Sequence, residues 1–208
     1  MPWGQFTFDK EGDDNPASKF TYSRIPGKLV NKKNEPIGQS GVTLARGYDL
    51  GAQSKNGARA LLTRVGLTKT QVDVLTGAAT LKAQNAVDYF DAHAAELSAI
   101  ELTREQQYLI SIQALKLRAE DAKRLYNTYM LQPSDTEWEK LDKKIVDMLV
   151  DLNYRGDMGP PNRAKVDAAV SANDLKALCS VMSDINYWTS KGVPVQRALE
   201  RKALVCGK

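Results

Sequence analysis

The composition of the chain changes near residue 51, and this change limits the folds that the chain can adopt. The first part is rich in glycine, proline, asparagine and aromatic residues, whereas helix-favouring patterns dominate from about Asn56 onward. Three β-prone runs (Phe20–Ser23, Lys28–Val30, Val42–Leu44) alternate with turn signals at Pro26–Gly27, Lys33–Pro36 and Ser40–Gly41. This alternation predicts a small antiparallel sheet with long loops.

The segment before these runs fits two structures. Phe6 and Phe8 alternate as in a strand, whereas Gly12 is typical of the cap that ends a helix. The sequence alone leaves both possibilities open.

Helix start signals mark the second part of the chain. Three capping-box patterns predict helix starts at Thr68 with Gln71, at Thr103 with Gln106, and at Ser134 with Glu137. The last is followed by an amphipathic stripe wide enough for a buried central helix that ends near Tyr154; the stripe comprises Leu141, Ile145, Met148, Leu149 and Leu152. A break at Met158–Pro161 then precedes helices expected at about 162–171, 173–187 and 194–205.

These patterns predict an α+β fold, mostly α. We expect residues 1–208 to form a single domain, with a small β-containing lobe at about 12–51 and a larger helical lobe at about 52–208. At 208 residues and 42% hydrophobic, the chain is long enough to build its own core.

The rare residue types exclude several kinds of chemistry. The net charge of +4 is too small to indicate nucleic-acid binding. His93 is the single histidine, which argues against a zinc site or a serine or cysteine triad, and we expect no metal and no cofactor. Cys179 and Cys206 lack C-x-x-C spacing. Each is expected to be a small buried residue, with a disulfide between them left open. Carboxylate chemistry remains.

The amino terminus lacks the basic and apolar regions of a signal peptide, and no run is long enough to span a membrane. We therefore expect synthesis as a soluble cytoplasmic chain that would need another route to any extracellular target.

One stretch, Ser40–Gly51, carries the residues for carboxylate chemistry. It displays Thr43 and Asp49 in a glycine-bracketed turn, and Glu11 stands upstream before Gly12. An acid, a base and a hydroxyl that holds water are what hydrolysis of a glycosidic bond needs. Glu11 is the candidate acid, Asp49 the candidate base, and Thr43 the candidate for positioning the water. The same residues also fit a helix end, a turn aspartate and a strand threonine.

The pattern E-G followed by S-G-V-T-x3-G-Y-D-L-G closely resembles the lysozyme-like domains of pesticin and of type VI secretion spike proteins, and more distantly the phage-type lysozymes. The close match covers about residues 6–51. The resemblance implies a lysozyme-like fold with Glu11, Thr43 and Asp49 as the catalytic set. It also implies supporting or substrate-binding roles for Gly41, Arg46, Gly47 and Tyr48.

A weaker resemblance extends to the carboxy terminus. Trp188, Pro194 and Arg197 are similar to the closing W…P…R pattern of phage-type lysozymes, in which the arginine pairs with the catalytic glutamate. Here the spacing from proline to arginine is one residue longer. Pro161–Lys165 also matches a string of that family, but we interpret it as a decoy because it directly follows the predicted core helix.

The chain departs from phage-type lysozymes between the two halves of the predicted site. Glu11 and Thr43 are 32 positions apart (43 minus 11), a longer insertion than those enzymes carry. The insertion contains Asp13, Asp14 and Glu35, any of which is an alternative carboxylate to Asp49.

The resemblance implies an inverting peptidoglycan muramidase that acts as an antibacterial effector or toxin in the periplasm of a target cell. We expect a monomer whose partners are glycan strands, an acidic immunity or inhibitor protein and a secretion carrier, with no nucleic acid. The alternatives are a phage endolysin and a catalytically silent wall-binding module of the same fold.

Overall fold

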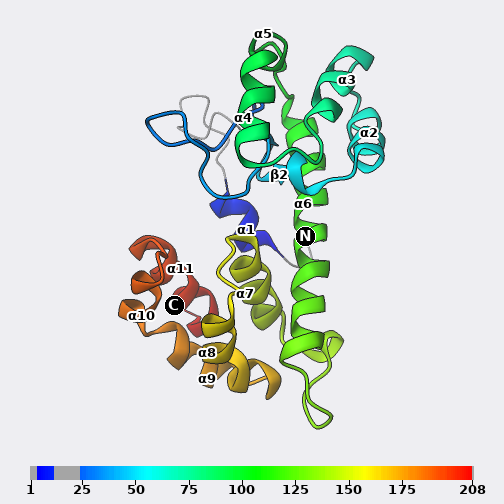
Figure 1. The fold of residues 1–208 in the computed structure, drawn as a ribbon. Helices are drawn as coiled ribbons and strands as arrows, with labels where there is room; N and C mark the ends of the chain where they lie inside the picture. Colours follow the sequence, from blue (N-terminus) through cyan, green and yellow to red (C-terminus); the bar gives the residue numbers. More distant parts are fainter. Residues whose placement is uncertain (1–3, 12–23, 208) are drawn as a thin grey trace. The chain divides into compact units, whose positions relative to one another are not determined.

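The computed structural model of the protein describes residues 4–11 and 24–207 (Figure 1). These residues form eleven α-helices and one two-stranded sheet, and the fold is α+β, mostly α, as the sequence predicts. Within this described part, no helix has the length and apolar character needed to cross a membrane.

The chain divides into two compact units. The first, which we call the hairpin unit, is residues 8–114, and the second, the disulfide unit, is residues 1–7 with 115–208. This division differs from the expected lobe boundary near residue 51, because the helices between residues 55 and 98 belong with the hairpin. Two helices, α1 (Gln5–Lys10) and α6 (Arg104–Tyr129), contribute residues to both units. Phe6 and Phe8 both lie within α1, so this segment is a helix and not a strand.

A β-hairpin organises the hairpin unit. Strands β1 (Thr43–Leu44) and β2 (Tyr48–Asp49) are antiparallel and are followed by the short 3-10 helix η2 (Leu50–Ala52). Gly27 forms a bridge with Thr43, with N–H to O distances of 2.8 and 2.9 Å in the two directions. The predicted runs at 28–30 and 42–44 thus each form antiparallel β-bridges. The run at 20–23 lies outside the described residues.

Residues 28–37 form an arm beside helix α4 (Ala83–Ala92) (Figure 1). Val30 and Pro36 pair across it, and the Asp91 carboxylate on α4 accepts hydrogen bonds from Lys28 Nζ and, at 3.1 Å, from Asn34 Nδ2. The arm belongs to the described part, residues 24–42, of the long insertion that separates Glu11 from Thr43.

The remaining helices of the hairpin unit are α2 (Lys55–Arg64), α3 (Lys69–Gly77) and α5 (Ala94–Ser98). The Thr68 capping box is formed: its hydroxyl accepts from Gln71 N at 3.3 Å, and Gln71 Oε1 accepts from Thr68 N at 3.0 Å. Thr103 and Gln106 make the same reciprocal pair before α6, so two of the three predicted capping boxes are confirmed.

Helix α7 (Lys143–Tyr154) is the buried centre of the disulfide unit. The predicted stripe is buried and the helix ends at Tyr154 as expected, but it begins nine residues later than Ser134 (143 minus 134). The cap is Asp142, whose carboxylate accepts from Lys144 N at 2.8 Å. Residues near Ser134 instead form a turn in which Asp135 accepts from Gln132 N, and the 3-10 helix η3 (Trp138–Lys140) follows.

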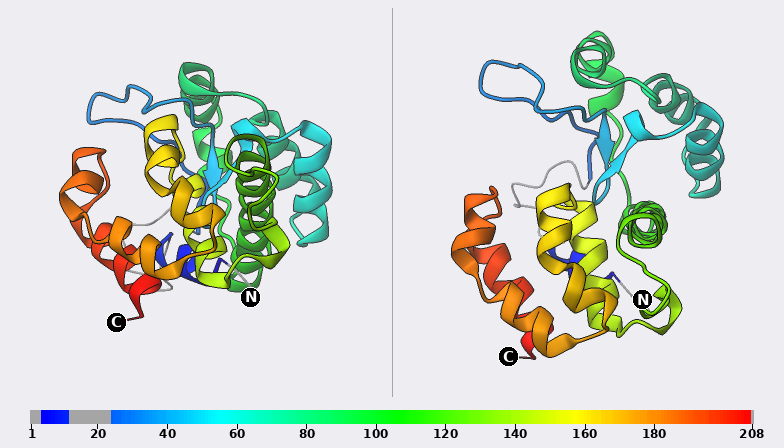
Figure 2. Two further views of the ribbon diagram at one scale, coloured as in Figure 1. Left: turned by 90° about the horizontal axis from the view of Figure 1, so that it is seen from below. Right: turned by 60° about the horizontal axis from the view of Figure 1, so that its bottom comes forward.

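Four helices share one hydrophobic core with α7: α8 (Pro160–Ser171), α9 (Leu175–Met182), α10 (Ile185–Ser190) and α11 (Val195–Cys206). The helix expected over 173–187 is thus two helices, because the Asp184 carboxylate caps a new start by accepting from Tyr187 N at 3.1 Å. Helices α9 and α11 lie side by side (Figure 2). A disulfide joins them through Cys179 and Cys206, a pairing that the sequence left open, and both residues are half-buried rather than fully buried.

Candidate active site

The hairpin places two of the three predicted catalytic residues opposite each other. Thr43 on β1 is the direct cross-strand partner of Asp49 on β2. The Thr43 hydroxyl donates to the carbonyl of Gly41 at 3.3 Å, and its backbone is held on the other side by Gly27. A spacing of six residues in the sequence therefore becomes one cross-strand pair, and such partners have neighbouring side chains.

Two backbone amides fix one oxygen of the Asp49 carboxylate. Asp49 Oδ1 accepts from Gly41 N at 2.9 Å and from Gly51 N at 2.8 Å, and it caps the start of η2. Within the described residues, both hydrogen bonds accepted by this carboxylate use Oδ1. The carboxylate is thus oriented by backbone groups while Oδ2 retains its capacity to accept a proton or a hydrogen bond.

The glycines of the motif are required by close packing. A Cβ atom on Gly41 would lie 2.4 Å from Gly51 N and 2.7 Å from the Leu81 carbonyl oxygen, and one on Gly51 would lie 2.6 Å from that same oxygen. These neighbours are backbone atoms, so no side-chain rotation relieves the clash. Gly41 and Gly51 therefore let the two ends of the motif approach closely enough for both amides to reach Asp49.

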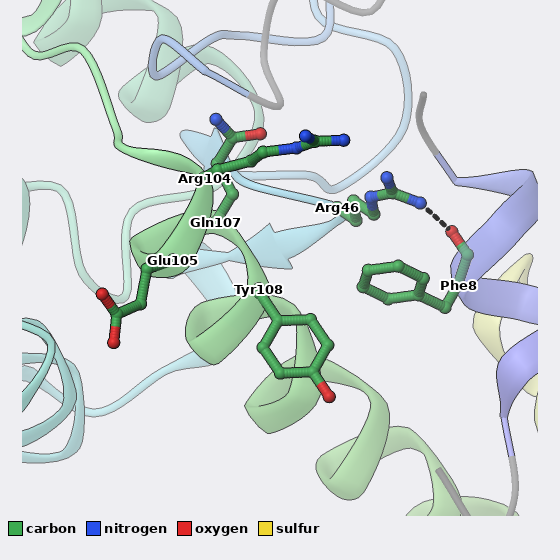
Figure 3. Close-up of a pocket in the computed structure, with 6 residues that line it drawn as sticks. All are labelled: Phe8, Arg46, Arg104, Glu105, Gln107 and Tyr108. Carbon is green, nitrogen blue, oxygen red and sulfur yellow. Dashed lines mark hydrogen bonds between the residues drawn. The ribbon is translucent and has the colours of Figure 1, made fainter. Parts of the chain in front are cut away.

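The loop of the hairpin joins it to the end of helix α1. Arg46 is buried, and its Nη1 donates to the Phe8 carbonyl at 2.6 Å (Figure 3). Its guanidinium lies over the Phe8 ring, 3.9 Å from the ring centre, and its backbone N–H donates to Ser111 Oγ at 3.1 Å. Arg46 thus links the hairpin loop to the segment that leads into Glu11.

Glu11 is half-buried and follows the last residue of α1, three positions after Phe8. Its backbone segment is therefore connected to the hairpin that carries Thr43 and Asp49. That its carboxyl group lies close enough to the Asp49 carboxyl to act on the same glycosidic bond stays a prediction.

Tyr48 and Gly47 have structural positions within the hairpin. Tyr48 is buried as the cross-strand partner of Leu44, and burial raises the pKa of its phenol to about 12. It stays neutral and packs in the core rather than lining a substrate surface. Gly47 adopts a positive φ of 87°, which the tight turn of the hairpin loop requires and which glycine permits without strain.

Arg197 lies in the disulfide unit, buried on α11. Its guanidinium binds the Asp151 carboxylate on α7, with Nε 3.3 Å from Oδ2. Arg201 Nε binds the same carboxylate at 2.7 Å, and Arg201 Nη2 binds Asp157 at 2.7 Å. The pairing of Arg197 with Glu11 stays a prediction.

The sequence interpretation missed this buried cluster. Its signals were present: Asp151 stands inside the apolar stripe of α7, and Arg197 and Arg201 stand four apart on α11. A buried carboxylate such as that of Asp151 favours buried cations on a neighbouring helix.

The alternative carboxylates have separate positions. Glu35 is exposed in the turn of the arm, where it accepts from Asn31 Nδ2 at 2.7 Å. Asp13 and Asp14 lie outside the described residues. Pro161–Lys165 lies in the first turns of α8.

His93 sits between α4 and α5, with Nδ1 3.1 Å from Glu96. A group of three or more His, Cys, Asp or Glu side chains placed to hold a metal does not occur within residues 4–11 and 24–207.

Comparison with known proteins gives one family. A domain of unknown function, DUF8812, matches residues 4–202, which is nearly the whole chain. The chain belongs to the DUF8812 family. No curated protein matches it. The DUF8812 match spans both units.

Proposed function

We propose that this DUF8812 protein is a lysozyme-like peptidoglycan muramidase that hydrolyses the β-1,4 bond between N-acetylmuramic acid and N-acetylglucosamine. The observation that carries the proposal is the cross-strand pair of Thr43 and Asp49, in which backbone amides hold Asp49 Oδ1 and leave Oδ2 to act. The likeness of the surrounding motif to pesticin-type lysozyme domains supports the same assignment.

In the proposed reaction, Glu11 donates a proton to the leaving glycosidic oxygen. Asp49 Oδ2 takes a proton from a water molecule that attacks the anomeric carbon from the opposite face. Thr43 holds that water through its hydroxyl oxygen, which retains a lone pair while the hydroxyl hydrogen bonds to the Gly41 carbonyl. The attack in a single displacement inverts the anomeric carbon.

Asp49→Asn is the sharpest test of this mechanism. An asparagine oxygen can accept the same two bonds from Gly41 and Gly51, so the hairpin is retained while the base is lost. General base catalysis contributes about 10²- to 10⁴-fold, and we expect wall lysis to fall within that range with the melting temperature nearly unchanged. Full lysis by Asp49→Asn would remove Asp49 from the mechanism.

The acid is tested by Glu11→Gln with Glu137→Gln as the matched control, since Glu137 is exposed and lies in the other unit. Lysis should be lost only in the first variant. Analysis of the digested wall should show new reducing ends at muramic acid. Released stem peptides would indicate an amidase or peptidase instead, and binding without cleavage by the unmodified chain would indicate a silent wall-binding module.

The disulfide supports a site of action outside the reducing cytoplasm. Disulfides form and persist in oxidising compartments such as the bacterial periplasm, and Cys179 and Cys206 are paired. An antibacterial effector or toxin delivered to the periplasm of a target cell fits this pairing. A phage endolysin released onto the host wall fits it equally, and a neighbouring gene for an acidic immunity protein would favour the effector.

A further inference from the structure

A cavity of about 350 Å³ opens beside the hairpin loop, entirely within the hairpin unit (Figure 3). It is lined by Phe8 from α1, Arg46 from the hairpin loop, and Arg104, Glu105, Gln107 and Tyr108 from the first turns of α6. Its size lies at the lower end of the range for ligand sites, which suits one or two sugar rings rather than a long chain.

The lining combines a rigid wall with an exposed aromatic ring. The Phe8 ring lies between the Arg46 guanidinium and the Tyr108 ring (Figure 3), with a ring-centre distance of 5.9 Å and an interplanar angle of 79° to Tyr108. Phe8 is thus fixed from two sides. Tyr108 is 47% exposed, so part of its ring is available to a ligand.

The polar groups of the cavity carry both signs of charge and an amide. Arg104 is a cation, Glu105 an exposed anion, and Gln107 is held by a bond of 2.9 Å from its Nε2 to the Leu102 carbonyl, which leaves Oε1 as an acceptor. The Glu105 carboxylate would repel a simple anion. A purely apolar ligand would remove water from the charged groups without replacing their hydrogen bonds to water. A neutral ligand with an apolar face and a rim of hydrogen-bond donors and acceptors fits both the aromatic and the polar parts of the lining.

We propose that this cavity is a saccharide subsite that binds an N-acetylhexosamine ring of the glycan, with the apolar face of the sugar on Tyr108. The assignment rests on the proposed muramidase function for its choice of sugar. The positions of the lining residues agree with it, because Arg46 lies between Thr43 and Asp49 in the hairpin and Phe8 precedes Glu11 by three residues. A glycan strand held at Thr43 and Asp49 would extend into a neighbouring subsite of this kind.

The test measures binding of short β-1,4-linked N-acetylglucosamine oligomers to the full chain carrying Glu11→Gln, so that no probe is cleaved. Adding Tyr108→Ala should weaken binding about tenfold, whereas Tyr108→Phe, which keeps the ring, should bind like the parent. Leu109→Ala is the matched control, since Leu109 is an exposed neighbour that does not line the cavity. Backbone amide shifts on titration should concentrate at residues 46 and 104–108.

Unchanged affinity in Tyr108→Ala, or amide shifts that avoid these residues, would overturn the subsite even if the unmodified chain lyses walls. Tyr108-dependent binding by a chain that lyses no wall would keep the subsite and overturn the muramidase. A chain that neither binds the oligomers nor lyses walls would overturn both.

Discussion

Reduction of the Cys179–Cys206 disulfide should destabilise the protein strongly. The bond closes a loop with a sequence separation of 27 residues, and the loop-entropy relation gives about 3.5 kcal/mol for a loop of that length at 25 °C. For a chain of this size, a loss of 1 kcal/mol lowers the melting temperature by about 2–4 °C, so reduction should lower it by about 10 °C.

The loss should be concentrated in helix α11. The disulfide holds the last residue of α11 to the middle of α9, while Arg197 and Arg201 hold its earlier turns to Asp151. Reduction releases the end of the helix first, and the buried ion pairs then carry the remaining attachment. Backbone amides near Cys206 should therefore exchange with solvent faster after reduction than those near Arg197.

Thermal unfolding with and without excess reductant measures the effect, and alkylation with mass analysis verifies the redox state. The double variant Cys179→Ala with Cys206→Ala is the control, because its melting temperature should match the reduced protein and should not respond to reductant. A shift of less than about 2 °C in the unmodified chain, or an equal shift in the double variant, would refute the assignment of this stability to the disulfide.

Three further predictions concern local structure. Gly41→Ala should lower the free energy of unfolding by about 2–3 kcal/mol in denaturant titration, because its Cβ would meet fixed backbone atoms. Thr68→Ala should cost about 1 kcal/mol, whereas Ser134→Ala should cost less than about 0.5 kcal/mol because Ser134 caps no helix. Burial raises the pKa of Asp147 above its usual 3.8, so its stabilising contribution is full below that value and is lost as pH rises through the raised pKa; Asp147→Asn, which can still accept from Gly4 N, should therefore match the unmodified chain near pH 3 and exceed its stability at pH 7.

Local patterns were sufficient where one short segment determines its own structure. The hairpin at 43–49 follows from a β-prone run and a glycine-containing turn, and the Thr68 and Thr103 caps follow from reciprocal side-chain bonds within four residues. The sequence placed Gly41 and Gly51 around a turn but did not show why glycine is needed at these positions. Their need for close backbone approach depends on Leu81, which lies thirty residues beyond Gly51 (81 minus 51).

Local patterns failed where two equally good local solutions compete. Ser134 with Glu137 is a valid capping pattern, yet the apolar stripe begins only at Leu141, and Asp142 caps the helix next to it. The segment 173–187 is typical of one continuous helix, but Asp184 caps a second start within it. In both cases the helix starts directly after an aspartate whose carboxylate accepts from a backbone N–H of the first turn.

Contacts between distant helices could not be assigned from local spacing. The pairing of Cys179 with Cys206 depends on the packing of α9 against α11, and the bonds of Asp151 to Arg197 and Arg201 depend on the packing of α11 against α7. An aspartate inside an apolar stripe, together with two arginines four apart on another helix, is a sequence pattern that indicates the second set of contacts.

Asp49 has both a structural role and a proposed chemical role, and the residue type helps to separate them. Capping η2 and joining Gly41 to Gly51 need one acceptor oxygen, which asparagine can supply as well as aspartate. The second oxygen takes part in neither of these bonds, but an ionised carboxylate is the group that a general base requires beside a hydroxyl such as that of Thr43. Asp49→Asn therefore separates the two roles, because it keeps the cap and removes the charge that the proposed general base needs.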